Sequence, residues 1–520
     1  MTASQSKILY KHHQVLSDFM KSNLRSDTRI ENSKWFLFAV VIFYLFVAYN
    51  STGYHNPDEH FQIIEFANYK LGLATLSDLA WEYNAQIRSG IQPGLCFFIF
   101  KLLRSIGITD VYFLSFALRA LTAIFAVFAI KGFINANSDS IERKNHLAYV
   151  LISYFLWFLP FINVRFSSES WSGLFFLLSL SIVQNSESRS PQKDVLLGAL
   201  LGMAFLFRYQ SGMFIAGIGL WLIFIERTKF ARLVLMVAAG LAVLLIGVLA
   251  DKWLYGQFTF APYNYFKANI IQDIASQYGV SPWYEIIRYI VNGPGPIGIF
   301  ILLSYIILLV RRPKHIVIWA SLPFLLVHAI IAHKELRFVF PLANLAPLVL
   351  MLGFQEASSI VKLIKPKWIF NAALVILAIT DIAGLIVVST KSAGNAKISI
   401  AQYIDRHYRN KRVNLLYREG LNPYSNWPVP INTFYRNNNV DLTEIVTIWE
   451  SDLTKKKKKG YTNLVTISNN DITGPKTIAL IKQLNLVEVH QSIPWIDQKI
   501  LALYNRSFND DNQILYEFRE

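Results

Sequence analysis

The sequence predicts an all-α polytopic transmembrane protein of about ten to twelve spans with a small α/β soluble domain at its C-terminus. Three observations lead to this fold class. The 520-residue chain is 53% hydrophobic and only 16% charged, whereas an average soluble protein is roughly 25% charged. Apolar runs recur along most of the chain, and several approach the roughly 20 residues that a helix needs to cross a bilayer. After about residue 390 the composition becomes polar.

The first apolar run, Trp35–Tyr49, follows a polar arm of residues 1–34. No small-residue cleavage site follows Tyr49, so we expect this run to stay in the membrane as an anchor rather than to be removed as a signal peptide. The arm has more Lys and Arg than Asp and Glu, which predicts a cytoplasmic location.

The later apolar runs complete a transmembrane domain over residues 35–389, among them Val111–Ile130, Leu233–Ala250, Pro296–Val310 and Trp368–Val388. Basic loops mark the cytoplasmic face at 227–232, 311–314 and 362–367. The opposite face then carries three loops, at 51–90, 251–292 and 333–338, together with residues 390–520. Counting spans from the two ends differs by one crossing within 147–225. We expect 195–208 or 209–225 not to span fully.

The C-terminal region, residues 390–520, alternates β-branched runs with helical patterns. The runs are Val413–Tyr417, Asn463–Ile467 and Ile500–Tyr504, and a helical pattern covers 474–486. This alternation predicts a small α/β domain. The chain's net charge of +16 includes the Lys455–Lys459 run, which is typical of a solvated loop. Because this run lies on the non-cytoplasmic face, no nucleic-acid partner is expected.

A first polar cluster follows the first span, at residues 55–62. Pro57 suits the first position of a helix that Asn56 caps, and Asp58 and Glu59 then lie in the first turn, where the helix dipole favours negative charge. One interpretation is a capped interfacial helix. The other is a carboxylate that removes the proton from a sugar hydroxyl. The spacing of the neighbouring histidines fits no zinc pattern, so no metal site is expected.

Two further clusters lie at residues 81–94 and 333–338. The first combines interfacial aromatic residues with many hydrogen-bonding groups and suggests either a membrane anchor or a surface that binds a sugar or headgroup. The second places several ionisable residues in one short hairpin. Its basic residues either extend toward the interface or bind a phosphate. If the basic residues only extend toward the interface, the presence of His333 and Glu335 is not explained.

Single charges also interrupt apolar runs elsewhere. Arg165 and Glu169 form a polar break between two runs, and Arg208 forms another. Charges at such positions need partners and mark candidate functional sites. Charged or polar residues inside spans could instead only bridge helices, as we expect for Arg119, His328 and Asp381.

Together these segments resemble glycosyltransferase family 22, the dolichyl-phosphate-mannose-dependent α-mannosyltransferases of glycosylphosphatidylinositol (GPI) and N-glycan assembly, within the GT-C superfamily. Residues 55–62 are similar to the family's H-P-D-E-x-x-Q loop, with Asn56 between the His and the Pro. Residues 81–89 are similar to its T-W-E-[WY]…R-S segment, with Ala80 in place of the Thr. Residues 333–341 match its H-K-E-x-R-F…P signature, and the first loop favours the GPI branch.

The resemblance implies a GT-C-like fold and an inverting transfer from dolichyl- or polyprenyl-phosphate mannose to a glycolipid acceptor. It implies Asp58 as general base, with Glu59 in support, and a donor-phosphate site made of His333, Lys334 and Arg337. Expected substrate-binding residues are Gln62, Glu82, Arg88, Arg165, Glu169, Arg208 and Glu335. No cofactor or metal ion is required, because basic side chains can stabilise the phosphate that leaves.

The expected partners are membrane lipids, the donor and the acceptor. The site should face the lumen of the endoplasmic reticulum in a eukaryote, or the periplasm from the inner (plasma) membrane of a bacterium. A multi-pass transporter or flippase is the main alternative, although such proteins usually show repeated halves and midplane charges. A structural subunit is a third reading. Neither the acceptor nor the oligomeric state follows from the sequence.

Overall fold

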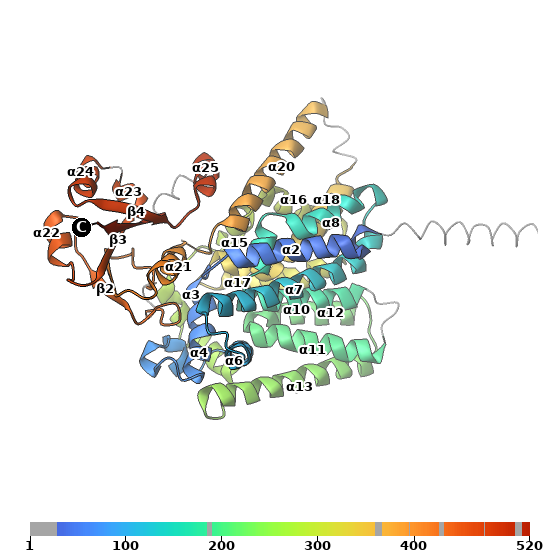
Figure 1. The fold of residues 1–520 in the computed structure, drawn as a ribbon. Coiled ribbons are helices and arrows are strands. Elements are labelled where there is room, and N and C mark those ends of the chain that lie inside the picture. The colour runs from blue at the N-terminus through green and yellow to red at the C-terminus, as the bar shows by residue number, and fades with distance from the viewer. Residues whose placement is uncertain are drawn as a thin grey trace, which may run out of the picture.

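The computed structural model describes residues 29–184, 190–358, 367–394, 396–425, 431–472, 474–504 and 512–519. A helical bundle carries a separate α/β domain at one end (Figure 1). We call this the domain end of the bundle, and the opposite one the far end. Residues 1–28 of the N-terminal arm and residues 362–366 of a basic loop lie outside the described residues.

In the part of the chain that the structure describes, the bundle has eleven principal helices: α2 (Lys34–Asn50), α7 (Val111–Asn137), α8 (His146–Phe155), α10 (Ser168–Gln184), α11 (Pro191–Phe207), α12 (Gly212–Phe224), α13 (Phe230–Tyr255), α16 (Pro296–Arg311), α17 (Ile316–Ile330), α18 (Ala346–Glu356) and α20 (Lys367–Thr390). Further helical segments connect them: α3 (Pro57–Phe61), α4 (Ile64–Lys70), α5 (Trp81–Ala85), α6 (Ile91–Ser105), α9 (Phe158–Asn163), α14 (Ala261–Phe266), α15 (Glu285–Asn292) and the 3₁₀ segment η9 (Leu336–Leu345).

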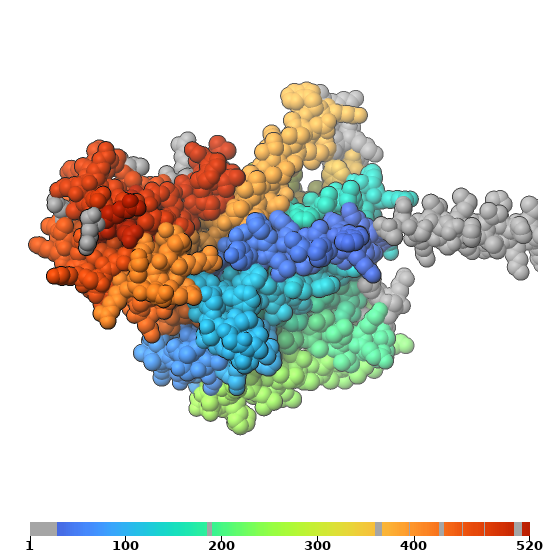
Figure 2. All heavy atoms as spheres, viewed as in Figure 1, coloured from blue at the N-terminus to red at the C-terminus, as the bar shows by residue number. Residues whose placement is uncertain are grey.

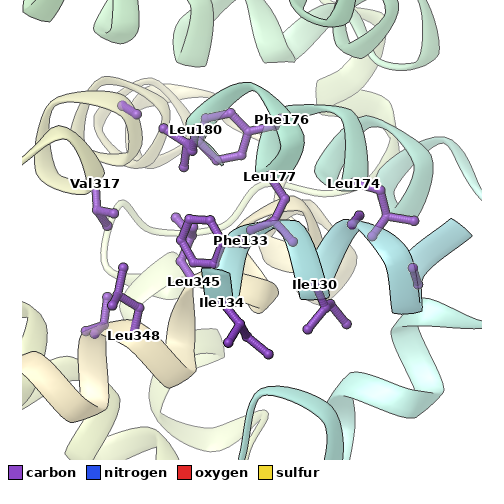
Figure 3. Packing of buried hydrophobic residues seen from close by; sticks show 14 of the residues in the cluster. Ile130, Phe133, Ile134, Leu174, Phe176, Leu177, Leu180, Val317, Leu345 and Leu348 are labelled. Atoms are coloured by element: carbon purple, nitrogen blue, oxygen red, sulfur yellow. The ribbon is translucent and has the colours of Figure 1, made fainter. Parts of the chain in front are cut away.

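Apolar side chains hold the bundle together from within and face outward as well. Figure 3 shows part of the largest buried cluster, with side chains from α7, α10, α17 and α18. Phe176, Phe214 and Phe324 stack across three helices, with ring centroids 4.2 and 4.1 Å apart. On the outside, Leu245 of α13 is 67% exposed and Ile379 of α20 is 62% exposed. Helices that are apolar on their outer surface are those expected to contact lipid.

Full-length spans are fewer than the ten to twelve expected. Within the described residues, four helices have at least 18 residues and enough apolar character to cross a membrane, and the bent pair α16–α17 would add a fifth. The four are Val111–Ser140, Phe230–Tyr255, Leu336–Glu356 and Lys367–Thr390. Other apolar helices are shorter: α2, α10 and α11 have 17 residues each. A helix of this length extends about 26 Å, slightly less than a hydrocarbon core of about 30 Å.

The two counts of spans differ by one because α6 does not cross the bundle from end to end. The expected segments, 195–208 and 209–225, are not the cause. Both ends of α6 are at the domain end: Gly90 donates its backbone N–H to Asp251 at 2.7 Å, and Asp110 beyond α6 pairs with Arg409 of the C-terminal domain at 3.1 Å. Figure 1 shows α6 end-on, across the other helices. By contrast, α12 starts beside the domain end and reaches the far end, where Trp221 donates to the carbonyl of Lys314 at 2.8 Å.

The C-terminal domain is a mixed five-stranded sheet with helices, which confirms the expected α/β class. Strand order is β2-β1-β3-β5-β4, with β1 parallel to β2 and β3, and β5 antiparallel to β3 and β4. The strands are β1 (Val413–Tyr417), β2 (Val440–Glu444), β3 (Thr462–Ser468), β4 (Leu486–Gln491) and β5 (Gln513–Phe518). The helices are α21 (Lys397–Tyr408), α22 (Glu450–Lys455), α23 (Asn469–Ile472), α24 (Pro475–Gln483) and α25 (Trp495–Tyr504).

One expected strand is wrong. The run Ile500–Tyr504 forms the end of helix α25 and is not a strand. A short apolar run fits a strand or a buried helical turn equally well, and the preceding polar residues from Asp497 onward continue the helix. Asp497 also joins the domain to the bundle, because it accepts a hydrogen bond from the Thr390 hydroxyl at 2.7 Å.

Candidate active site at the domain end

Asp58 lies in the first turn of α3, as the sequence predicts. Pro57 is the first residue of this five-residue helix, and the Asn56 side chain caps it by accepting from the Asp58 N–H at 3.1 Å. The other end of the same amide donates to Glu335 Oε2 at 3.0 Å. Asn56, the residue that departs from the family pattern, therefore links the first sequence cluster to the third.

Arg337 is the centre of the site. Its Nη1 donates to Asp58 Oδ2 at 2.7 Å and to Glu169 Oε1 at 3.3 Å. Its Nε and Nη2 form a fork with the two oxygens of Glu335, at 2.8 and 2.9 Å. The Arg337 side chain is only 10% exposed. A buried guanidinium needs such partners, and three carboxylates supply them.

Close packing of η9 against α10 brings Arg337 to Glu169. A Cβ on Gly173 of α10 would lie 2.8 Å from the Cα of Pro341 in η9, so a larger residue at 173 would push the two elements apart. Glu169 is also held from the other side, because Arg208 at the end of α11 donates to Glu169 Oε1 at 2.6 Å. The polar breaks that the sequence shows at Glu169 and Arg208 are thus one buried ion pair.

Arg88 brings the second sequence cluster to the same carboxylate. Its Nη2 lies 3.3 Å from Asp58 Oδ2 and 3.8 Å from Glu82 Oε1. Gln62 donates to the same Glu82 oxygen at 2.8 Å. Segments separated by some 280 residues therefore converge on one acidic oxygen, which two guanidinium groups share.

A small hollow of about 40 Å³ opens beside Asp58. Among its lining residues are the expected Asp58, Glu59, Gln62, Arg88, Glu169 and Arg208. Residues that were not among the expected substrate-binding residues also line it, among them Ser89, Gln92, Tyr209, Gln210 and Tyr265. Most of these stand next to the recognised charges in the sequence. Tyr265 lies in the 251–292 loop, where no motif signalled it.

The pKa values of the two neighbouring carboxylates shift in opposite directions. Burial alone would raise the pKa of Asp58, but the charges of Arg337 and Arg88 outweigh it and lower the pKa. For Glu59, burial dominates and raises the pKa to about 7, although the Arg165 guanidinium, 3.7 Å away, opposes this shift. Both carboxylates line the hollow, and Asp58 is the one whose lowered pKa keeps it ionised at neutral pH.

The structure separates the three residues expected to bind the donor phosphate. Arg337 contacts Asp58, but the Lys334 ammonium donates to the carbonyl oxygens of Ser281 and Ile331, at 3.0 and 2.5 Å. His333 contacts Gly279 and the carboxylate of Glu335, the latter at 3.0 Å. Lys334 and His333 thus support the loop around Arg337. None of the three lines the hollow beside Asp58, and Arg337 is linked to it through its hydrogen bonds to the lining residues Asp58 and Glu169.

Arg165 and the histidines are likewise turned away from the hollow. Arg165 donates to the carbonyl oxygens of Ser51 and Gly53, at 2.5 and 3.2 Å. His55 stacks on Phe340, and His60 bonds to Glu65 at 3.0 Å. Within the described ranges, no group of three or more His, Cys, Asp or Glu side chains is arranged to hold a metal ion.

Comparison with known families and relatives identifies the same class as the motifs. A profile of the Alg9-like mannosyltransferase family matches residues 34–418. Mannosyltransferase APTG1 of Arabidopsis thaliana is 26% identical over 303 residues, which cover 56% of this chain and 53% of the relative. GPI mannosyltransferase 3 of Candida albicans is 24% identical over 361 residues, covering 68% and 70%. GPI alpha-1,2-mannosyltransferase 3 of Homo sapiens is 24% identical over 323 residues, covering 61% and 56%.

The chain spans about half the length of several of the curated relatives it matches. Among solved structures, ArnT from Cupriavidus metallidurans in the apo state is similar with a TM-score of 0.48 and 12% identity, covering 93% of this chain and 97% of that one. The Archaeoglobus fulgidus oligosaccharyltransferase has a TM-score of 0.44 and 12% identity, covering 85% and 69%.

Proposed function

The chain belongs to the Alg9-like mannosyltransferase family, and we propose that it transfers mannose from dolichyl- or polyprenyl-phosphate mannose to a glycolipid, with inversion at the anomeric carbon. One observation carries the mechanism: the ionised Asp58 carboxylate borders a hollow and shares its Oδ2 between Arg337 and Arg88. A general base and two phosphate-binding groups are therefore in direct contact.

The proposed reaction is a single displacement. The acceptor hydroxyl oxygen attacks the anomeric carbon of mannose, and Asp58 takes the hydroxyl proton. The bond between that carbon and the phosphate oxygen breaks, and its electron pair leaves with the polyprenyl phosphate. Guanidinium groups stabilise the charge that develops on the leaving phosphate, which is the role we assign to Arg337 and Arg88.

Donor binding would also free the base. Arg337 Nη1 donates to both Asp58 and Glu169. A donor phosphate that competes for Nη1 would weaken the bond to Asp58 Oδ2 and leave this oxygen able to accept a proton. This coupling is consistent with the close spacing of base and cation, and it makes proton transfer depend on the donor being bound.

The position of Arg208 extends this phosphate-binding surface. Arg208 lines the hollow together with Arg88 and is only 5% exposed. We assign Gln62, Glu82 and Glu169 to sugar binding, because Gln62 and Glu169 line the hollow and Gln62 donates a hydrogen bond to Glu82. Lys334, His333 and Glu335 then orient Arg337 instead of all contacting the donor.

The acceptor is proposed from the names of the relatives, and the compartment from the position of the basic loops. Several are GPI mannosyltransferases, so we propose a GPI-precursor-like glycolipid. The active site would face the lumen of the endoplasmic reticulum, or the periplasm in a bacterium, because the domain end is the side opposite the basic loops at 227–232 and 311–314.

A transfer assay tests this proposal. Purified protein in nanodiscs receives radiolabelled polyprenyl-phosphate mannose and total glycolipid extract from its own cells. The wild type should move label into a new glycolipid, and Asp58→Asn should bind the donor without transfer. If the donor is bound or moved across the bilayer and no glycolipid is labelled, the protein is a transporter and the proposal fails.

A further inference from the structure

A segment of the C-terminal domain lies buried against the helix that carries Asp58. Residues 432–435 (Asn432, Thr433, Phe434 and Tyr435), which we call the latch, reach from this domain into the domain end of the bundle. In the space-filling view, the orange and red C-terminal domain lies against the blue N-terminal segments at this end (Figure 2). Neither the sequence motifs nor the proposed mechanism gives the latch a role.

Glu65 of α4 is the main polar contact of the latch. Its Oε1 accepts the backbone N–H groups of Thr433 and Phe434, at 3.0 and 3.1 Å, and its Oε2 accepts the Thr433 hydroxyl at 2.8 Å. Glu65 Oε1 also bonds to His60 Nε2 of α3 at 3.0 Å. Glu65 is fully buried, so these contacts replace the water that a carboxylate otherwise needs. The latch and α3 thus share one carboxylate.

Aromatic rings fix the same segment from a second direction. Tyr435 stacks on His60 with ring centroids 5.3 Å apart and on Tyr112 of α7 at 5.2 Å. Phe434 stacks on Phe100 of α6 at 5.4 Å. His60 therefore meets the latch both through its ring face and, by way of Glu65, through its Nε2 atom. These contacts are largely withdrawn from solvent.

The length of α3 makes these contacts matter for Asp58. A helix of five residues has little stability of its own, since isolated helices shorter than about 12 residues are marginal. Asp58 is held at one end through Asn56 and Glu335. At the other end, two residues away, His60 is held by Glu65 and the latch. The orientation of the Asp58 carboxylate therefore depends on both ends of α3.

We propose that the latch is a positioning element for Asp58: the C-terminal domain, through Thr433 and Glu65, keeps α3 where its carboxylate meets Arg337 and the hollow. This inference rests on the proposed function, because it takes Asp58 to be the base. The latch does not contact the reacting atoms. It acts through Glu65, His60 and α3.

A second Thr–carboxylate contact joins the same two parts of the molecule and provides a matched control. Thr390, at the end of α20, donates its hydroxyl to Asp497 of α25 at 2.7 Å. It joins the C-terminal domain to the bundle as Thr433 does, but none of the described contacts of Thr390 or Asp497 involves α3. A mere docking role predicts the same result at both sites, whereas a positioning role predicts a difference.

The experiment compares Thr433→Val and Thr390→Val in the full-length protein, using the transfer assay. We expect Thr433→Val to lower kcat about tenfold or more, as small displacements of catalytic groups do, with KM for the donor changed less than twofold. Thr390→Val should leave kcat unchanged. Thr433→Ser keeps the hydroxyl and should restore kcat. Hydrogen–deuterium exchange should rise in residues 57–62 for Thr433→Val and not for Thr390→Val.

Equal kcat values for Thr433→Val and wild type, or equal losses in both valine variants, would overturn the positioning role. If Thr433→Val does not accumulate as folded protein, Phe434→Leu replaces it, with the same expected rise in exchange at 57–62. Absence of transfer by the wild type, or activity in Asp58→Asn, would instead reject the proposed function. The exchange difference would still report whether the latch holds α3.

Discussion

Asp58 and Glu59 are consecutive carboxylates in the first turn of α3, but they belong to different surroundings. The Asp58 side chain is 23% exposed and contacts Arg337 and Arg88. The Glu59 side chain is 9% exposed and faces Arg165 at 3.7 Å. Arg165 itself is tied to the backbone carbonyl oxygens of the chain before α3. Both carboxylates border the hollow, but Asp58 is paired with two guanidinium groups from distant segments, whereas Glu59 faces one guanidinium that is held by the backbone.

The comparison shows that partners, and not residue type, decide which acid can act as a base. Neighbouring residues on a helix point about 100° apart, so α3 presents its two carboxylates to different elements. Two close cations lower the pKa of Asp58, whereas burial raises that of Glu59 to about 7. Only Asp58 is thereby kept fully ionised at neutral pH.

The largest difference in the rate of mannose transfer is expected between the variants Asp58→Asn and Glu59→Gln. Loss of the base should reduce single-turnover transfer by about 10³-fold, within the range for general base catalysis. Glu59→Gln should retain activity within about tenfold, because the amide preserves size and burial. Single-turnover rates and donor binding of the purified variants measure this. An equal loss in both would mean that the two acids act as one unit.

The second-largest difference is expected in donor affinity, between loss of the buried Arg337 and loss of the exposed Arg288. Arg337→Ala should weaken affinity for polyprenyl-phosphate mannose by about 10²-fold, because a buried guanidinium lost from a phosphate site costs roughly 2–5 kcal/mol. Arg288→Ala, which breaks an exposed ion pair with Glu285 at 2.9 Å, is the matched control and should leave affinity unchanged. Titration of nanodisc samples with labelled donor gives both constants. Unchanged affinity in Arg337→Ala would remove Arg337 from the phosphate site.

Glu59 should also make stability depend on pH. Its pKa in the folded protein, about 7, lies above the ordinary value of 4.5. The unfolded chain therefore loses this proton first as pH rises, so the stabilising contribution is complete below pH 4.5 and is lost as pH approaches 7. We expect the unfolding temperature of wild type, relative to Glu59→Gln, to fall between these pH values and to level off above them. A constant difference would contradict the raised pKa.

The smallest change in donor affinity is expected when Lys334 is replaced. Its ammonium is bonded to two backbone carbonyl oxygens, so Lys334→Met should change donor affinity less than about twofold while lowering the unfolding temperature, because it leaves those acceptors without their donor. Thermal unfolding and donor titration on one preparation separate the two effects. A loss of donor affinity like that of Arg337→Ala would mean that Lys334 also binds the donor phosphate.

The sequence predicted much of the site because its chemistry is encoded locally. The cap at Asn56, the position of Pro57 as the first helical residue and the first-turn carboxylates all follow from neighbouring residues and appear as predicted. The orientation of Lys334 did not follow, since only two residues lie between it and Arg337 and nothing local shows which of the two contacts Asp58. The course of α6 was missed for a similar reason: an apolar run of 15 residues fits a span or a helix lying across the bundle equally well.

By itself, the sequence determined that this is a membrane protein of the Alg9-like mannosyltransferase family, with a helical apolar part, an α/β C-terminal domain and a carboxylate at residue 58 in the first turn of a capped helix. Those properties depend on hydropathy, local helix signals and short motifs, which are readable along the chain. Only the tertiary structure decided that Arg88 and Arg337 meet on one oxygen of Asp58, and that a segment near residue 433 supports α3. Such contacts join residues hundreds of positions apart, and their geometry exists only once the helices have packed.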